Sequence, residues 1–171
     1  MRWVDRSFRL DTSAELFPEV IERLRGTPGR VEEKVAGLAP EVLTRRDGDK
    51  WSVQEHVGHL LDLDELHTGR LDDYVAGVEV LRAADITNQK TTEAHHNRRP
   101  IAELTRSFRQ ERLRFVERLE QWNPQRREQS AVHPRLKQPM RVIDMIWFVA
   151  EHDDHHLARM TELARKFASG S

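Results

Sequence analysis

The chain has 171 residues, a length typical of one domain, so we expect a single unit over residues 1–171, with residues 1–12 and 169–171 peripheral. Charged residues make up 33% of the chain and hydrophobic residues 37%, which favours a helix-rich protein over a sheet-rich or disordered one. The 28 basic and 29 acidic side chains nearly cancel, and this balance argues against a nucleic-acid partner. No apolar run is long enough to span a membrane, and charge follows the first residue too soon for a secretory signal, so we expect a cytoplasmic protein.

Two helical segments separated by a break are predicted near the start of the chain. Residues 14–25 form the first helix. Pro28 lacks the amide hydrogen that a continuous helix needs, so we place a break at residues 26–29 and a new helical arm at residues 30–38. Residues 44–50 are rich in charge and contain a glycine, which indicates a loop.

The second long helix has a strong start signal. The side chain of Ser52 can accept the backbone amide of Glu55, while the Glu55 carboxylate accepts the amide of Ser52. We expect this helix to continue to about Val80. Residues 82–98 are polar and lack periodicity, so they predict a long connection of the kind that is often functional.

Two more helices complete the predicted fold. Pro100 suits the first turn of a third helix that reaches about Trp122. Residues 124–139 contain three prolines and indicate a loop, and the last helix is expected over residues 139–167. No alternating strand pattern is present. Four long helical segments predict an all-α four-helix bundle, with an irregular helical domain as the alternative.

The last helix carries two inward histidines. The chain has no cysteine, so a metal ion would have to be held by His, Asp or Glu. On a helical wheel, His152 and His156 both lie inside the apolar stripe that includes Met145 and Val149. Buried imidazoles need polar partners, and rings four residues apart can bring two nitrogens to roughly 3.3 Å, as one tetrahedral ion requires. The pair is therefore able to chelate.

A third ligand should come from the second helix, and the wheel leaves three candidates open. His59 lies at the margin of the apolar stripe, whereas His56 and His67 lie further inside it. The wheel by itself slightly favours His56 or His67.

Charged residues beside the histidine pair have competing interpretations. Asp153 either orients a ligand imidazole through its second nitrogen or has a surface or packing role. Arg159 faces inward and either binds an anionic substrate group or pairs with a carboxylate such as Asp62. Asp153 and Arg159 are the candidate catalytic residues, and the catalytic group itself stays unassigned. Asp154 and His155 are expected to be solvated.

Two other polar groups are expected at the surface. His95 and His96 are predicted to be exposed in the connection, with a lid that carries a base as the alternative. The arginines between Arg106 and Arg118 alternate with acidic and apolar residues, which indicates a solvated helix face. The string of residues 152–156 is only loosely similar to the H-E-x-x-H motif of metalloproteases, since Asp153 replaces the glutamate that acts as base.

The resemblance of this chain to a known family is carried by two segments. They are Trp51 to Leu60, with the sequence WSVQEHVGHL, and Glu151 to Leu157, with the sequence EHDDHHL. Together they resemble the DinB/YfiT-like superfamily, in which a WSxxExxxHL segment on helix two partners an HDxHHL segment on helix four. The resemblance covers about residues 13–168.

The resemblance implies a four-helix bundle, often a homodimer, with a divalent ion held by three histidines. These match His59, His152 and His156, so the resemblance decides a choice that the wheel left open. Members of the family with known activity include transferases and isomerases that use low-molecular-weight thiols such as bacillithiol or mycothiol. Arg159 and Met160 stand where the family commonly has Gln-Ile, so no single member's substrate is carried over.

The sequence thus predicts a metal-dependent enzyme, thiol S-transferase-like or hydrolase, that acts on a small molecule. Zinc or nickel is the expected ion, with a low-molecular-weight thiol as a possible cosubstrate. Three protein ligands leave one position open, and the ion can either lower the pKa of water or stabilise a thiolate. The alternative is a non-catalytic bundle that binds a metal or ligand. The sequence assigns no role to five other histidines, which are His56, His67, His95, His96 and His155.

Overall fold

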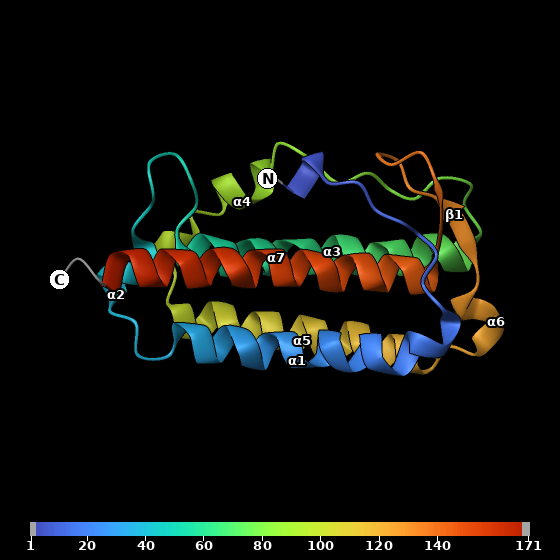
Figure 1. The fold of residues 1–171 in the computed structure, drawn as a ribbon, viewed down its shortest axis with the longest axis horizontal. Coiled ribbons are helices and arrows are strands. Elements are labelled where there is room, and N and C mark those ends of the chain that lie inside the picture. Colours follow the sequence, from blue (N-terminus) through green and yellow to red (C-terminus); the bar gives the residue numbers. More distant parts are fainter. Residues whose placement is uncertain (1–2, 169–171) are drawn as a thin grey trace.

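A computed structural model describes residues 3–168 and contains four long helices in two layers (Figure 1). The helices are α1 (Phe17–Val35), α3 (Val53–Ala76), α5 (Ile101–Glu120) and α7 (Val142–Ala168). Helices α3 and α7 form one layer, and α1 and α5 form the other. Between the layers, α1 packs on α7 and α3 packs on α5. The predicted four-helix bundle is confirmed.

Short elements join the long helices. They are 3-10 helices at Trp3–Asp5, Ala14–Leu16 and His96–Arg98, the helices α2 (Pro40–Thr44), α4 (Gln89–Glu93) and α6 (Pro124–Arg127), and the strands β1 (Ser130–Val132) and β2 (Pro139–Arg141). Because α4 and the third 3-10 helix lie within residues 82–98, the long connection has more local structure than its lack of periodicity indicated.

Helix α1 runs without interruption through Pro28, so the predicted break at residues 26–29 is wrong. A proline inside a helix removes one backbone hydrogen bond and costs about 3 kcal/mol. Thr27 and Pro28 are buried together with Leu24 and Val31 on the face that α1 presents to the bundle. Burial of that apolar face offsets the cost, so tertiary packing overrides the local signal.

Helix α3 begins and ends for local reasons that the sequence contains. The Ser52 Oγ accepts the amide of Glu55 at 3.1 Å, and Glu55 Oε2 accepts the amide of Ser52 at 2.9 Å, which confirms the predicted capping box. The helix stops before the predicted end at Val80 because Gly77 adopts the left-handed conformation, with φ of 68°.

A small hairpin occupies the segment that was expected to be a loop. Strands β1 and β2 pair antiparallel, with Ala131 opposite Met140, so the absence of strands in our prediction is wrong here. Each strand has three residues, which is too short to show the alternation that identifies a strand in a sequence. Burial of Ala131 and Met140 on the core side holds the hairpin against the end of the bundle.

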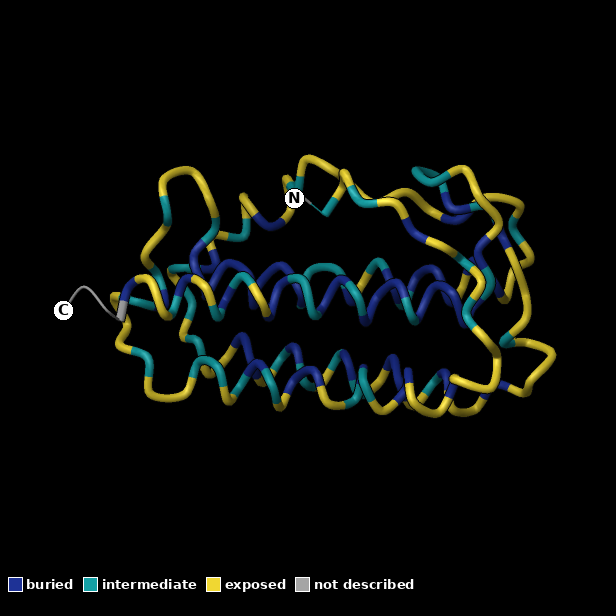
Figure 2. The backbone as a smooth tube through the Cα atoms, in the orientation of Figure 1, coloured by how far each residue is buried: buried dark blue, intermediate teal, exposed yellow. Residues whose placement is uncertain are grey.

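The α3–α7 layer is covered on its outer side as well. Figure 1 shows the N-terminal segment and α4 lying over this layer, and Figure 2 shows that both of its helices are buried over most of their length. Phe8 belongs to the main core cluster, and Trp3 packs on Phe8 and Phe148. The described part of residues 1–12 is therefore part of the packing and not peripheral, while residues 169–171 lie outside the described range.

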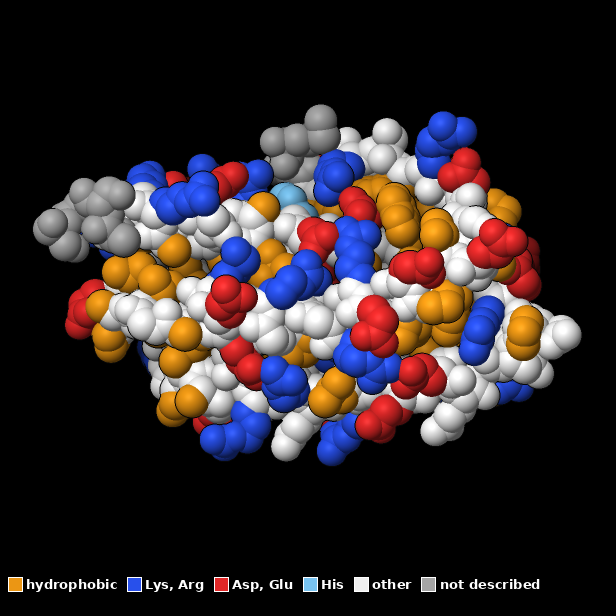
Figure 3. Space-filling view, turned by 60° about the horizontal axis from the view of Figure 1, so that its bottom comes forward, with side chains coloured by type: hydrophobic (Ala, Val, Ile, Leu, Met, Phe, Trp, Pro, Cys, Tyr) orange, Lys and Arg blue, Asp and Glu red, His pale blue; other side chains and the backbone are white. Residues whose placement is uncertain are grey.

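The surface carries charges of both signs. Figure 3 shows acidic and basic side chains interspersed over one face of the molecule. Among residues 3–168, no helix combines the length and the apolar character that a membrane crossing requires.

We expect two glycine-to-alanine substitutions to change stability in opposite directions. A Cβ atom on Gly58 of α3 would lie 2.2 Å from ring atoms of the buried His96, so Gly58→Ala should destabilise the protein by about 1–3 kcal/mol through overpacking. A Cβ atom on Gly26 of α1 would meet nothing within 4 Å, so Gly26→Ala should stabilise the helix by about 0.5–1 kcal/mol. Urea unfolding of both variants checks this, and an equal effect at the two positions would contradict it.

Candidate metal centre

Three buried imidazoles meet between α3 and α7. One ring nitrogen from each of His59, His152 and His156 lies within 4.8 Å of the other two. The Nε2 atoms of His152 and His156 are 3.0 Å apart, close to the separation expected for two ligands of one ion. The three residues are only 4–6% exposed. The structure thus brings together the three histidines that the family resemblance selected, and their binding of a metal stays a prediction.

The other two candidates from the second helix are outside the group of three nitrogens, although His56 borders it. His56 contacts the outer nitrogen of His156, with 2.7 Å between the two Nδ1 atoms, and His67 lies beside Phe115 with 6.2 Å between ring centroids. Residues 52–60 are all buried, because α5, α7 and the connection after α3 surround this part of the helix. A wheel that assumes a single buried face therefore cannot choose among the histidines of α3.

A chain of hydrogen bonds supports His59 from the connection between α3 and α5. The Nδ1 atom of His59 lies 3.1 Å from Thr91 Oγ1, and the Thr91 hydroxyl donates to Asp62 Oδ2 at 2.8 Å. The same carboxylate oxygen contacts His96 Nε2 at 2.8 Å. None of these roles was predicted from the sequence, although residues 82–98 were predicted to form a connection of the kind that is often functional. The expectation that His96 is exposed is wrong, since it is 1% exposed, whereas His95 is exposed as predicted.

Two tryptophans pack against the histidine cluster. The ring of Trp51 lies 4.5 Å from His59 and 6.2 Å from His156, and the ring of Trp3 lies 5.0 Å from His152. Trp51 directly precedes the capping residue of α3, so the motif that starts the helix also places an aromatic ring over the cluster. These indoles shield the imidazoles from solvent.

The electrostatics of the cluster suit a divalent cation. Burial lowers the pKa of His56 to about 3 and that of His59 to about 4, and it lowers the pKa of His152 and His156 well below the ordinary value. The imidazoles are therefore neutral at neutral pH, which is the form that binds metals. The Nδ1 atom of His152 is buried with no hydrogen-bond partner. Three neutral nitrogen donors on two rigid helices form a chemically suitable site for such an ion.

Comparison with known proteins decides the family. The family model of the DinB superfamily matches residues 23–160. The chain belongs to the DinB superfamily. A solved structure, that of YfiT from Bacillus subtilis, matches with a TM-score of 0.82 and 21% sequence identity over 95% of this chain and 94% of that one. That protein is described as a probable metal-dependent hydrolase with an unusual four-helix bundle topology. A search of curated proteins finds no match.

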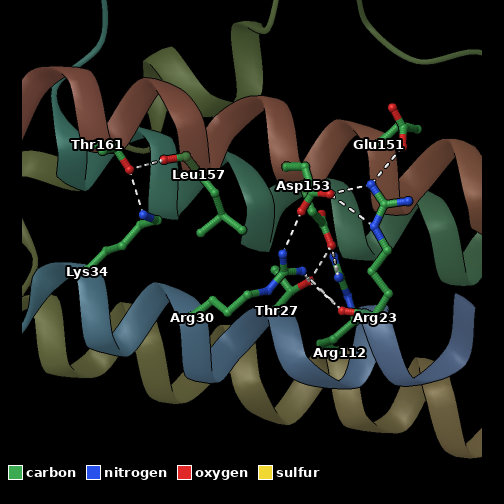
Figure 4. Close-up of polar contacts among 10 residues, drawn as sticks. Arg23, Thr27, Arg30, Lys34, Arg112, Glu151, Asp153, Leu157 and Thr161 are labelled. Atoms are coloured by element: carbon green, nitrogen blue, oxygen red, sulfur yellow. Dashed lines mark hydrogen bonds and ion pairs between the residues drawn. The ribbon is translucent and has the colours of Figure 1, made fainter. Parts of the chain in front are cut away.

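In this DinB chain a buried ion-pair network lies between the two helix layers, and Figure 4 shows its members Thr27, Arg112 and Asp153. Arg112 of α5 is fully buried and donates to Asp64 of α3 at 2.8 Å and to Asp153 of α7 at 3.1 Å. Thr27 of α1 donates to Asp153 at 2.9 Å, so all four long helices meet here. The prediction of a solvated face is therefore wrong for Arg112, whose side chain points into the bundle. Asp153 has a packing role, because its hydrogen bonds are with Arg112 and Thr27 and none joins it to an imidazole of the described residues.

The remaining charged residues near the pair differ in part from expectation. Arg159 is about two-fifths exposed and donates to Glu162 at 2.6 Å. Asp62 is bound by Thr91 and His96, so of the two alternatives for Arg159 the pairing with Asp62 is wrong. Asp154 pairs with Arg23 and Arg30 of α1, so it is not simply solvated. His155 is half-buried, with its ring 5.8 Å from that of Trp3.

A cavity of about 250 Å³ borders the cluster at His59. Asp62, Leu63, Leu66 and Thr91 line it beside His59, so it lies between α3 and the connection that follows this helix. It therefore reaches the cluster on the side of the Thr91–Asp62 hydrogen bonds.

We expect the metal-free protein to lose stability as the pH falls from about 7 to 4. The unfolded chain takes up protons on its histidines near pH 6.5, whereas the folded chain resists this because burial lowers the pKa of His56 and His59 to about 3 and 4. Each of these two histidines contributes its full stability at a pH above the unfolded pKa of 6.5. The contribution is lost as the pH falls from there toward the folded pKa, by about 2 kcal/mol per histidine at pH 5. Urea unfolding of chelator-treated protein at both pH values measures the loss. His56→Gln should reduce it, and His95→Asn, at an exposed position, should not; a loss independent of His56 contradicts the assignment.

Proposed function

We propose that this chain is a metal-dependent hydrolase that holds a divalent ion, zinc or nickel, through His59, His152 and His156. The observation that carries the proposal is the meeting of three buried, neutral imidazoles from two helices within 4.8 Å. The Nε2 atoms of His152 and His156 face each other at 3.0 Å, and the buried Nδ1 atom of His152 has no hydrogen-bond partner. The description of YfiT as a probable metal-dependent hydrolase supports the same reaction class.

The residues around the cluster have roles that fit hydrolysis. When bound, the ion supplies Lewis acidity and an open coordination position for activating water. Trp3 and Trp51 limit the access of bulk solvent to the three imidazoles. His155 has a pKa lowered by partial burial, so it is neutral at pH 7 and can accept a proton at the rim, where its ring lies 5.2 Å from that of His156. Asp153 is excluded as a base because Arg112 and Thr27 occupy it.

The substrate is proposed to be a small molecule. The cavity beside His59 has a volume of about 250 Å³, just below the usual range for ligand sites, so only a small molecule would fit. Its lining combines apolar side chains with Asp62, Thr91 and charged side chains of both signs, so it can bury an apolar group and bind a polar or charged one.

Thiol-dependent transfer is the second candidate function. The chain contains no cysteine, so the sulfur nucleophile would have to come from a separate low-molecular-weight thiol. Three protein ligands leave a position in which the ion can stabilise such a thiolate. The two functions differ in whether product formation needs added thiol.

Metal analysis followed by an activity screen tests the proposal. We expect freshly purified protein to contain about one transition-metal ion per chain, and chelation to lower its melting temperature. Reloading with zinc or nickel should restore hydrolysis of at least one member of a panel of small esters, amides and phosphoesters without thiol. Product formed only with added thiol would favour the transferase, and the absence of both bound metal and a chelator effect would overturn the metal site.

A further inference from the structure

The hydrogen bonds around His59 determine which of its nitrogens carries the proton. Asp62 is a partly buried carboxylate that can only accept hydrogen bonds in its ionised form. Burial raises its pKa, but hydrogen bonds from His96 and Thr91 outweigh this and hold the pKa below its ordinary value. The Thr91 hydroxyl therefore donates its single hydrogen to Asp62, with 2.8 Å between Thr91 Oγ1 and Asp62 Oδ2. Its oxygen can then only accept from His59.

The consequence for His59 is a fixed tautomer. Thr91 Oγ1 lies 3.1 Å from His59 Nδ1, so this nitrogen must carry the proton and Nε2 keeps a free lone pair. The other two histidines of the cluster lack such a constraint. The two ring nitrogens of His156 face imidazole nitrogens of His56 and His152, and the Nδ1 atom of His152 has no hydrogen-bond partner. Among the three rings, His59 is thus the one whose metal-binding nitrogen is determined by a carboxylate, acting through Thr91.

Packing holds Thr91 and Asp62 in this arrangement. Thr91 is 4% exposed on α4, and the neighbouring His96 also binds Asp62. The His96 ring fits against the backbone at Gly58, where a Cβ atom would lie 2.2 Å from it. Gln54 donates to the carbonyls of His96 and Arg99, each at 2.7 Å. The connection is thereby fastened to the same turns of α3 that carry His59.

We propose that Thr91 is a positioning residue for His59: its hydroxyl, held by Asp62, keeps the proton of His59 on Nδ1 and leaves Nε2 free to bind the ion. The inference rests on the proposed metal site and does not depend on the reaction catalysed there. It extends the site from the two helices into the connection between α3 and α5. Outer partners of this kind typically change metal affinity by about 10- to 100-fold when they are removed.

Three variants separate this role from a general effect on folding. Thr91→Val keeps the shape of the side chain and removes the hydroxyl, whereas Thr91→Ser keeps the hydroxyl. Thr92→Val is the matched control, because Thr92 is the exposed neighbour on α4 and its hydroxyl contacts only the carbonyl of Asn88. Zinc affinity is measured by competition with a chromophoric chelator. We expect Thr91→Val to bind zinc about 10- to 100-fold more weakly, and the other two to stay near the wild-type value.

The tautomer is measured directly in metal-free protein. Long-range 1H–15N correlation spectra of the imidazoles, with His59 assigned by its absence in His59→Gln, should show the proton of His59 on Nδ1 in the wild type and in Thr91→Ser. In Thr91→Val a substantial fraction should move to Nε2. A wild-type His59 protonated on Nε2 overturns the inference even if no variant folds, and so does equal zinc affinity of Thr91→Val and the wild type. The expected tautomer and affinity without hydrolysis would count against the proposed reaction alone.

Discussion

Replacing Arg112 by methionine is expected to destabilise the protein by about 3–5 kcal/mol, the effect seen when one partner is removed from a buried ion pair. Arg112 has no exposed surface, and its guanidinium binds Asp64 and Asp153, which are 1% and 0% exposed. Burial raises the pKa of Asp64 to about 6 even with Arg112 opposing it. Without the cation, two adjacent carboxylates would be left in the core, and each would have to bind a proton or remain uncompensated.

The size and pH dependence of this loss can be checked by urea unfolding. Arg109→Met is the matched control, because Arg109 lies on the same helix and forms a half-exposed pair with Glu32, so its loss should be below about 1 kcal/mol. The destabilisation caused by Arg112→Met should be smaller at pH 5 than at pH 7. Without the cation, the carboxyl pKa values in the folded variant should be raised, so protons neutralise the carboxylates at low pH. The folded variant then loses stability as the pH rises through those pKa values. The triple variant with Asp64→Asn and Asp153→Asn should recover part of the loss. An effect of Arg112→Met as small as that of Arg109→Met would contradict a charged network in the core.

The second large effect is expected at the imidazoles themselves. His152→Gln and His156→Gln should each abolish stoichiometric metal binding, because each removes one of three nitrogen donors and a glutamine cannot replace the imidazole at the same position. The loss in affinity should exceed the 10- to 100-fold range typical of outer partners. Metal content after dialysis and zinc competition both measure it, and hydrolytic activity should fall in parallel.

His155→Gln is the control for these variants. His155 lies on the same turn of α7, is half-buried, and contributes no nitrogen to the cluster. It should retain metal content, although a proton-accepting role at the rim would lower turnover. Full metal content in His152→Gln or His156→Gln would show that the ion is held elsewhere and would remove the basis for the hydrolase.

The ion-pair network and the metal site share α7 but are separable by these measurements. Asp153 and His152 are neighbours in sequence, yet Asp153 points toward Arg112 and Thr27 while His152 points toward His59 and His156. Arg112→Met should therefore lower the free energy of unfolding and leave metal affinity nearly unchanged. His156→Gln should lower metal affinity and have the smaller effect on the free energy of unfolding.

Local features of the chain predicted most of the long helices and two of the three candidate metal ligands. The capping box at Ser52 and Glu55 depends on residues three apart, and the pair His152 and His156 depends on the helical repeat, so both could be derived without knowing any neighbour. The choice of His59 over His56 and His67 needed the family resemblance, because α3 is buried on all sides at residues 52–60.

Contacts between distant segments were decided only by the tertiary structure. Periodicity places Arg112 on a charged helix and His96 in a polar connection, and neither pattern reveals that the folded chain buries both beside carboxylates of other segments. Pro28 stays inside a helix for the same reason, since the free energy that keeps it there comes from the opposite layer of the bundle. By itself the sequence determined the spacing of chemical groups along each helix, because that spacing follows from backbone geometry. How the helices and connections pack determined which of those groups meet, because burial and pairing depend on residues far apart in the chain.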